Sequence, residues 1–245
     1  YRLELKGNSE GPFATMLRLA NLDKIFDTEL DESGEHHTNF SFISPLVSHF
    51  DLLAKNSDLK LLSKIKDASF RNRNTNLNFS DLYSTLEYDS SSGIKDGFAT
   101  IKINNIPVKF DIQQGKKSGI FNTQLIAEEN FSPKKILSKF DNTKDIKGSS
   151  IFKIMLTLPS FIKEQLFIEP EIEVSSNLKG ISINLPDPLK KIEESEVEFN
   201  LIFKPYLNTP PILSFKYGDL FRGKFRFLNN LTEGFVIAGK KKQSI

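Results

Sequence analysis

The sequence predicts a mainly β protein, in which most strands form an antiparallel sheet beside two or three short helices. The first observation is the alternation of apolar and polar residues from Glu171 to Arg226, which is typical of strands with one dry and one wet face. The second is the placing of turn-forming residues between these runs, at 177–180, 186–188 and 208–211. Together they predict an antiparallel meander.

The N-terminal part alternates between strand and helix patterns. Residues 1–6 alternate as a strand, and a proline then suits the first turn of a helix over about 12–21, where apolar residues recur at helical spacing. Residues 31–37 are polar and predict a loop, and 38–43 predict a strand. Residues 46–65 fit either a helix or two strands.

The middle of the chain contains the clearest hairpin. Residues 97–112 alternate on both sides of Asn104-Asn105, and Asn tolerates the positive φ that a tight hairpin turn requires. A second helix is expected at 132–140, where Ser132 is a capping residue and Pro133 occupies the first position. Further strands are expected at 68–88, 120–126, 148–158 and 235–238.

Composition restricts the classes of function. The 33 basic and 31 acidic residues leave a net charge of +2, so nothing global favours nucleic acid. The absence of Cys excludes thiol catalysis, disulfides and cysteine-based zinc sites. No apolar run reaches the length of about 18 residues that a membrane-spanning helix needs. We expect one continuous body over 1–245 with a weak waist near 141–148, cut from a longer protein because the first strand starts abruptly.

Residues that could do chemistry are scattered. His36 and His37 are adjacent and lie in the predicted loop, and on a strand they would point to opposite faces, so a shared metal ion is not expected. Lys190-Lys191 fits either a contact with anionic headgroups near a membrane or a solvated turn, and the solvated turn is the favoured interpretation. No zincin, nucleophile-elbow or P-loop motif occurs. We therefore expect no catalytic residue, metal or cofactor, although a carboxylate pair facing a cleft would revive a carbohydrate-active enzyme.

The apolar strand faces leave two alternatives open. They can pack against each other in a closed sandwich or barrel, or they can line an open trough that accepts a greasy ligand. Strand parity assigns the candidate lining residues to one face, unless a bulge inverts a run. These candidates are Ile101, Ile103, Val108, Phe110, Ile112, Ile172, Val174, Ile181, Ile183, Leu185, Val197, Phe199, Leu201 and Phe203.

One segment resembles a known family. Residues 175–191 read SSNLKGISINLPDPLKK, and alternating strands and FKYGDLFRGKFRF follow. This pattern is similar to that of the AsmA-like family, in particular its YhdP branch, and GNSEGPFATMLRLAN near the start resembles the helix of that branch. The Lys-rich turn after Leu189 departs from the family pattern. The residues that match the motif are Ser176, Leu178, Gly180, Leu185, Pro186, Pro188, Leu189 and Lys191.

The resemblance implies a fold and a function. Proteins of this family are anchored in the inner membrane of Gram-negative bacteria, and their elongated, curved β-sheet forms an open apolar groove across the periplasm. The expected function is bridge-like transport of phospholipid between the inner and outer membranes, in which the groove shields the acyl chains. Partners at either membrane would contact parts of the longer protein. The alternative is a structural envelope spacer with a self-packed core and no lipid cargo.

Overall fold

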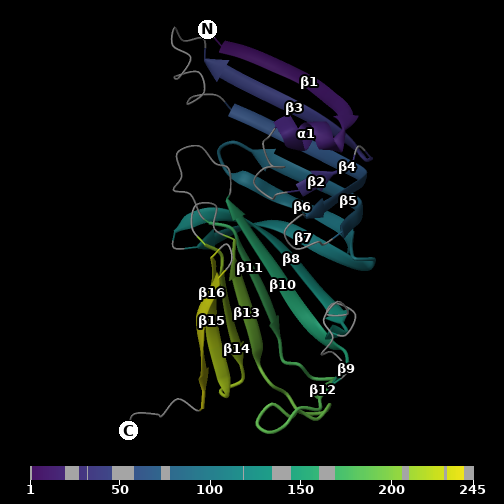
Figure 1. The fold of residues 1–245 in the computed structure, drawn as a ribbon. Helices are drawn as coiled ribbons and strands as arrows, with labels where there is room; N and C mark the ends of the chain where they lie inside the picture. Colours follow the sequence, from purple (N-terminus) through teal and green to yellow (C-terminus); the bar gives the residue numbers. More distant parts are fainter. Residues whose placement is uncertain are drawn as a thin grey trace. The chain divides into compact units, whose positions relative to one another are not determined.

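The computed structural model shows a mainly β protein (Figure 1). Among the residues it describes, fourteen strands form one antiparallel sheet, which is open because β1 and β16 end its strand order without pairing. Two further strands form a small second sheet. The described residues are 2–19, 28–31, 33–45, 58–72, 78–117, 119–133, 145–159, 169–205, 210–228 and 231–239.

The chain divides into two compact units. Unit 1 comprises residues 1–125 and 158–168, and unit 2 comprises 126–157 and 169–245. The weak waist expected near 141–148 falls inside unit 2, and residues 141–144 of it lie outside the described part of the chain.

Unit 1 contains long strands in the order β1-β3-β4-β5-β6-β7-β8, with β2 paired to β4. The helix α1 contacts β1 and β3, and its first residues, Phe13 and Ala14, are buried there. The elements are β1 (Arg2–Pro12), α1 (Phe13–Leu19), β2 (Thr28–Leu30), β3 (Glu35–Pro45), β4 (Asp58–Asn72), β5 (Asn78–Asp89), β6 (Gly93–Ile103), β7 (Ile106–Lys117) and β8 (Ile120–Phe131), the last of which continues into unit 2.

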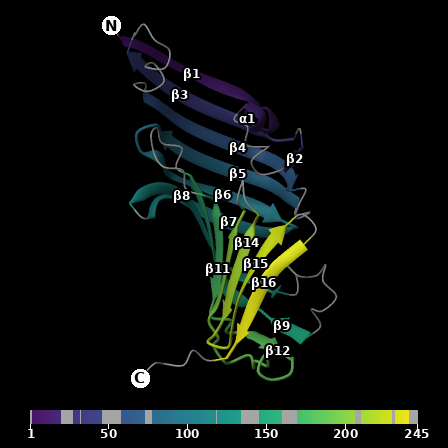
Figure 2. The ribbon, with the colours of Figure 1, turned by 60° about the vertical axis from the view of Figure 1, so that its left-hand side comes forward.

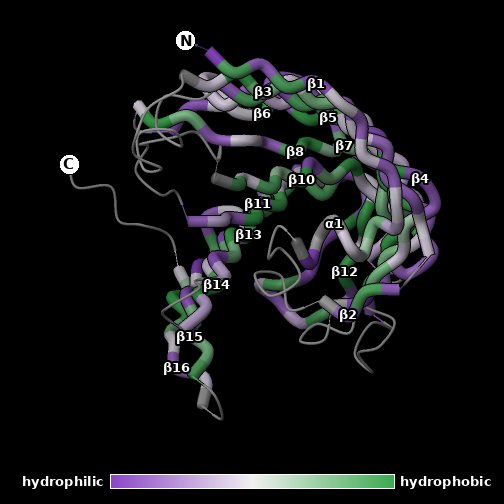
Figure 3. Tube along the Cα trace, turned by 90° about the horizontal axis from the view of Figure 1, so that it is seen from above, coloured by the Kyte–Doolittle hydropathy of each residue, from purple (hydrophilic) through white to green (hydrophobic). Residues whose placement is uncertain are grey.

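Unit 2 contains shorter strands in the order β10-β11-β13-β14-β15-β16. Figure 3 shows hydrophobic and hydrophilic residues alternating along β13 to β16. The elements are β9 (Ile146–Gly148), β10 (Ser150–Pro159), β11 (Glu171–Ser176), β12 (Ile181–Ile183), β13 (Phe199–Lys204), β14 (Ile212–Tyr217), β15 (Phe221–Leu228) and β16 (Leu231–Ala238).

Several sequence predictions are confirmed. The helix lies at 13–19, within the predicted range, and the hairpin turn has Asn104 and Asn105 at φ 47° and 67°, the left-handed values that favoured Asn there. Residues 58–65 adopt the strand alternative as the start of β4. The predictions for residues 46–57 and 134–140 lie outside the described residues.

Two sequence predictions are wrong. The predicted loop over 31–37 is a strand from Glu35 onward, because β3 pairs along its whole length with β1. The predicted meander is interrupted, because β12 leaves the large sheet and pairs with β9 in the second one. β11 therefore pairs directly with β13, and the intervening residues 177–198 form a separate turn-rich segment.

Candidate functional site

The apolar residues of β6 and β7 share one face of unit 1. The register places Ile101 opposite Val108 and Ala99 opposite Phe110, without a bulge, and directly opposite residues lie on the same face. The side chains of Ile101, Val108, Phe110 and Ile112 are all 9 % exposed or less. The structure therefore covers four of the predicted lining residues of unit 1.

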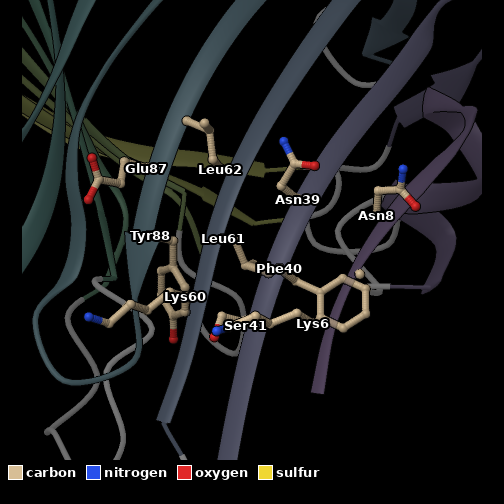
Figure 4. A pocket seen from close by; sticks show the side chains of 11 residues that line it. Lys6, Asn8, Asn39, Phe40, Ser41, Lys60, Leu61, Leu62, Glu87 and Tyr88 are labelled. Carbon is tan, nitrogen blue, oxygen red and sulfur yellow. The ribbon is translucent and has the colours of Figure 1, made fainter. Parts of the chain in front are cut away.

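The same face of unit 1 is more open toward β1. Leu5, opposite Phe42, is 48 % exposed. A shallow cavity of about 620 Å³ also lies at β1, β3, β4 and β5, and its lining includes a row in which Leu61 pairs with Tyr88 on one side and with Phe40 on the other (Figure 4). Most of its lining residues, including Lys6, Lys60 and Glu87, belong to the neighbouring rows, which alternate to the opposite face. The cavity is therefore of mixed polarity.

Unit 2 presents the larger partly exposed apolar surface. Register pairs align β11, β13, β14 and β15 so that their apolar residues fall on one face, and each of these side chains is half-exposed. We call this surface the unit 2 apolar face. It comprises Ile172, Val174, Phe199, Leu201, Phe203, Leu213, Phe215, Tyr217, Phe221 and Phe225.

Glycines let the aromatic rings of this face lie across neighbouring strands. A Cβ atom on Gly223 would sit 2.4 Å from Phe215 Cε1, and one on Gly234 would sit 2.4 Å from Phe225 Cδ1. The Phe215 and Phe225 rings are nearly parallel, with centroids 6.2 Å apart. A ring covering a cross-strand glycine replaces the side-chain packing that glycine lacks. The rings thus form a continuous apolar layer.

The opposite face of β11, β13, β14 and β15 is mainly polar and partly basic, although Ile202 and Ile212 also lie on it. Arg222, Lys224 and Arg226 of β15 are exposed on it. Lys216 Nζ lies 2.6 Å from Glu198 Oε2. Across these four strands the sheet therefore has one apolar and one mainly polar side, whereas on β16 Phe235 and Ile237 lie on the mainly polar side.

The other predicted lining residues lie in different environments. Five belong to the unit 2 apolar face, where Val174 is opposite Leu201 and Ile172 is opposite Phe203. Ile181 is buried in the small second sheet, at 1 % exposed. Val197 precedes β13, so it belongs to no strand. The half-buried members of the predicted set are Ile103, Ile172, Val174, Ile183, Leu185, Val197, Phe199, Leu201 and Phe203.

The motif residues build a compact turn segment around a buried lysine. Lys191 is only 4 % exposed, and its Nζ donates to the carbonyl oxygens of Ile181 at 2.7 Å and Ile192 at 3.0 Å. Its backbone exchanges two hydrogen bonds with Ile183. Burial lowers the pKa of the Lys191 ammonium. The prediction that Lys191 is solvated is wrong, because its ammonium satisfies carbonyls inside the segment.

The other motif residues fix the backbone of this segment. Ser176 Oγ accepts from Leu178 N–H at 3.0 Å and donates to the Ile151 carbonyl at 2.7 Å. Leu178 is buried. Gly180 has φ 89°, which only glycine adopts readily, and its carbonyl accepts from Ser149 N–H at 3.0 Å. The remaining motif residues, Leu185, Pro186, Pro188 and Leu189, form the outer turn with a cis Asp187–Pro188 peptide.

Titratable groups do not converge on a reactive site in the described residues. His36 and His37 point to opposite faces of β3: His36 is buried and His37 Nδ1 lies 2.6 Å from Glu10 Oε1. No group of three potential metal ligands occurs among the described residues. Asp89 has a lowered pKa because Ser91 Oγ and N–H donate to its carboxylate, with Lys95 and Lys60 nearby. These hydrogen bonds are typical of a carboxylate that stabilises a turn.

Comparisons with known proteins identify no relative. No protein-family model, no curated protein and no solved structure matches the chain. Among the described residues, no helix has the length and apolarity needed to cross a bilayer. A function is therefore inferred from the geometry of the strand faces and from the sequence resemblance.

Sequence reasoning missed half of the unit 2 apolar face. The contributions of β14 and β15, including Leu213, Phe215 and Phe225, were not among the predicted lining residues. The available signal was the same alternation that identified β13, since ILSFKY and FRGKFRF also place apolar residues at every second position.

Proposed function

We propose that this chain binds the acyl chains of phospholipids on the unit 2 apolar face and shields them from water during transfer. The observation that carries the proposal is that every residue of this face is half-exposed, while the reverse face of β11, β13, β14 and β15 is mainly polar. Large contiguous apolar patches are rare on monomeric proteins and mark sites of interaction. A sheet with one apolar face and an open edge can bind the acyl chain of a phospholipid while the lipid headgroup stays in water.

The energetics favour an elongated apolar ligand. Each acyl CH₂ group moved from water to an apolar surface gains roughly 0.8 kcal/mol. The rings of Phe215 and Phe225 and the aliphatic chains of Leu201 and Leu213 offer contacts without demanding hydrogen bonds. Because the face has no described charged residue among its members, it suits hydrocarbon better than a peptide or a sugar.

The sequence resemblance supports a cellular setting for this binding. We propose that the chain is part of an inner-membrane-anchored protein in the periplasm of a Gram-negative bacterium, where it carries phospholipid toward the outer membrane. Its partners at the two membranes would contact other parts of the longer protein. The binding itself needs no catalytic residue and no cofactor.

A matched pair of substitutions tests lipid binding. Leu201 and Ile202 are neighbours on β13, both half-exposed, and they face opposite sides of the sheet. In Leu201→Asp, a carboxylate in the middle of the apolar face should abolish cross-linking to a phospholipid that carries a photoreactive acyl chain. Ile202→Asp should retain most of it. Equal cross-linking of both variants, each folded by circular dichroism, would refute binding at this face.

A second candidate, the structural spacer, is favoured by a separate observation. The four covered residues of β6 and β7, such as Val108 and Phe110, are what a self-packed core requires. Mass spectrometry of lipids extracted from gently purified protein distinguishes the two functions. A lipid carrier should contain phospholipid that is lost in Leu201→Asp, whereas a spacer should contain none.

A further inference from the structure

The two terminal strands of the large sheet differ in how their free edges are protected. β1 pairs only with β3, and β16 pairs only with β15, among the strands that the structure describes. Figure 2 shows β16 at the end of the row formed by β14, β15 and β16 in unit 2. A free edge presents unpaired N–H and C=O groups, which invite another strand unless charge or proline blocks it.

One backbone hydrogen bond shows which residues of β16 face outward. Gly239 N–H donates to the Leu220 carbonyl at 3.0 Å, so odd-numbered residues of β16 direct their backbone groups to β15. Even-numbered residues therefore direct theirs to the free edge. These are Thr232, Gly234, Val236 and Ala238, and none of them is charged or a proline.

The free edge of β1, in contrast, is protected. Phe13 N–H donates to the Gly34 carbonyl at 3.0 Å, so even-numbered residues of β1 face outward. Four of these are charged, including Glu4 and Lys6, which form an ion pair at 2.6 Å, and Pro12 has no N–H to offer. Charged residues and proline are the usual protection of an exposed edge. The outward-facing positions of β16 contain neither a charged residue nor a proline.

Apolar exposure on β16 points to a missing neighbour. Phe235, Val236 and Ile237 are consecutive, so they lie on both faces, and they are 54 %, 53 % and 42 % exposed. A ligand on one face would cover only one parity of this run. A strand added at the edge would flank side chains on both faces and would pair with the free backbone groups.

We propose that β16 pairs with β16 of a second copy of this chain, antiparallel about a two-fold axis at Phe235. This register matches all four outward-facing residues: Thr232 with Ala238 of the other copy, and Gly234 with Val236. The two Phe235 rings then lie directly opposite each other. A two-fold contact of this kind closes on itself and produces a dimer instead of a fibre.

Charge favours self-pairing over pairing with β1. Glu233 is the only charged residue of β16, and the two-fold register sets it opposite Ile237 of the other copy, so like charges do not meet. The exposed basic residues of β15, including Arg222 and Lys224, are three strand spacings apart across the pair. That is about 14 Å, beyond the Debye length of roughly 8 Å at physiological salt, so their repulsion is largely screened.

Disulfide trapping tests both the pairing and its register. The chain has no Cys, so a single introduced thiol reports unambiguously. Phe235→Cys places two thiols opposite each other at a Cα separation of about 4.5 Å, within the range for a disulfide. It should form a covalent dimer on mild oxidation. Glu233→Cys, on the same face two residues away, should not, but it should cross-link when mixed with Ile237→Cys.

Oligomeric state supplies the second readout. Light scattering should give twice 27.8 kDa for the unmodified chain at micromolar concentration. Val236→Pro removes an outward N–H without touching the bonds to β15, and Val236→Lys adds a charge; each should raise the dimer dissociation constant at least about tenfold. Asn8→Pro and Asn8→Lys make the same changes at an outward position of β1 and should leave the dimer unchanged.

Three results would overturn the proposal. They are a monomer at all concentrations up to about 100 μM, equal cross-linking of Phe235→Cys and Glu233→Cys, or a sensitivity to Asn8→Lys equal to that of Val236→Lys. The pairing leaves the unit 2 apolar face uncovered, so it does not depend on lipid binding. Leu201→Asp should therefore still dimerise.

Discussion

The contact between Gly148 and Gly180 allows a sharp test of how the small second sheet is held. Gly148 has φ 89°, and a Cβ atom there would sit 2.0 Å from the Gly180 carbonyl oxygen. That carbonyl accepts the Ser149 N–H bond at 3.0 Å. In Gly148→Ala, the methyl group must displace the backbone of residues 180–181 and break this bond.

The expected loss can be assembled from three contributions. A left-handed φ costs a non-glycine residue about 1–3 kcal/mol. Forcing an atom into a filled space costs about 1–3 kcal/mol, and the lost hydrogen bond costs about 1 kcal/mol. We expect Gly148→Ala to lower the free energy of unfolding by about 3–7 kcal/mol and to speed amide exchange at Ile183, which bonds to Lys191.

Gly119→Ala is the matched control. Gly119 has φ 83°, but a Cβ atom there would meet nothing within 4 Å. Only the conformational cost remains, partly offset by about 0.4–1 kcal/mol from the less flexible unfolded chain. Urea denaturation of both variants gives the difference, and similar losses, within about 0.5 kcal/mol, would refute the contribution of the close backbone contact.

Two other predictions concern charged groups. Asp89 is ionised and hydrogen-bonded in the fold, and its folded pKa is below the usual 3.8, so its stabilisation is complete above pH 3.8 and is lost as pH falls through the folded value. The loss of stability with falling pH, measured by urea denaturation at a series of acid pH values, should therefore be flatter for Asp89→Asn than for the unmodified chain, and identical pH profiles would contradict this role of Asp89. Lys191→Met should destabilise unit 2 by about 1–3 kcal/mol. Two carbonyls lose a charge-assisted donor worth about 1.5–3 kcal/mol each, and this loss is partly offset because the charge no longer has to be buried. Chemical denaturation of the control Lys190→Met, at an exposed position, should show a change under about 0.5 kcal/mol, and an equal loss in both variants would contradict the role of Lys191.

Local sequence patterns predicted the strands well because both the alternation of apolar residues in a strand and the residue preferences of turns depend on residues that are adjacent in the sequence. The Asn104-Asn105 turn and the alternation of Phe199 and Leu201 needed no information from distant parts of the chain. The register then placed Ile101 beside Val108 as expected. These features are set by backbone sterics and by burial of one face, which act over a few residues.

The sequence-based predictions failed where segments distant in the chain decide strand pairing and side-chain burial. ISI at 181–183 has the alternation of a meander strand, but it pairs with 146–148, and the buried ammonium of Lys191 holds it there. A lysine in a Pro-rich turn gives no sequence signal of burial. Likewise, Val108 and Leu201 alternate in the same way, yet one is covered and the other half-exposed. Tertiary packing, which alternation does not encode, makes that difference.

The rings that cover Gly223 and Gly234 invert the usual rule for improving a strand. Valine is intrinsically a better strand residue than glycine, so a stability-design scheme based on propensity would choose it at both positions. Here a branched side chain would clash with Phe215 or Phe225 and displace the phenylalanine ring from its position over the glycine. Engineering of this sheet therefore has to treat each phenylalanine and its glycine as one unit, exchanged together or not at all.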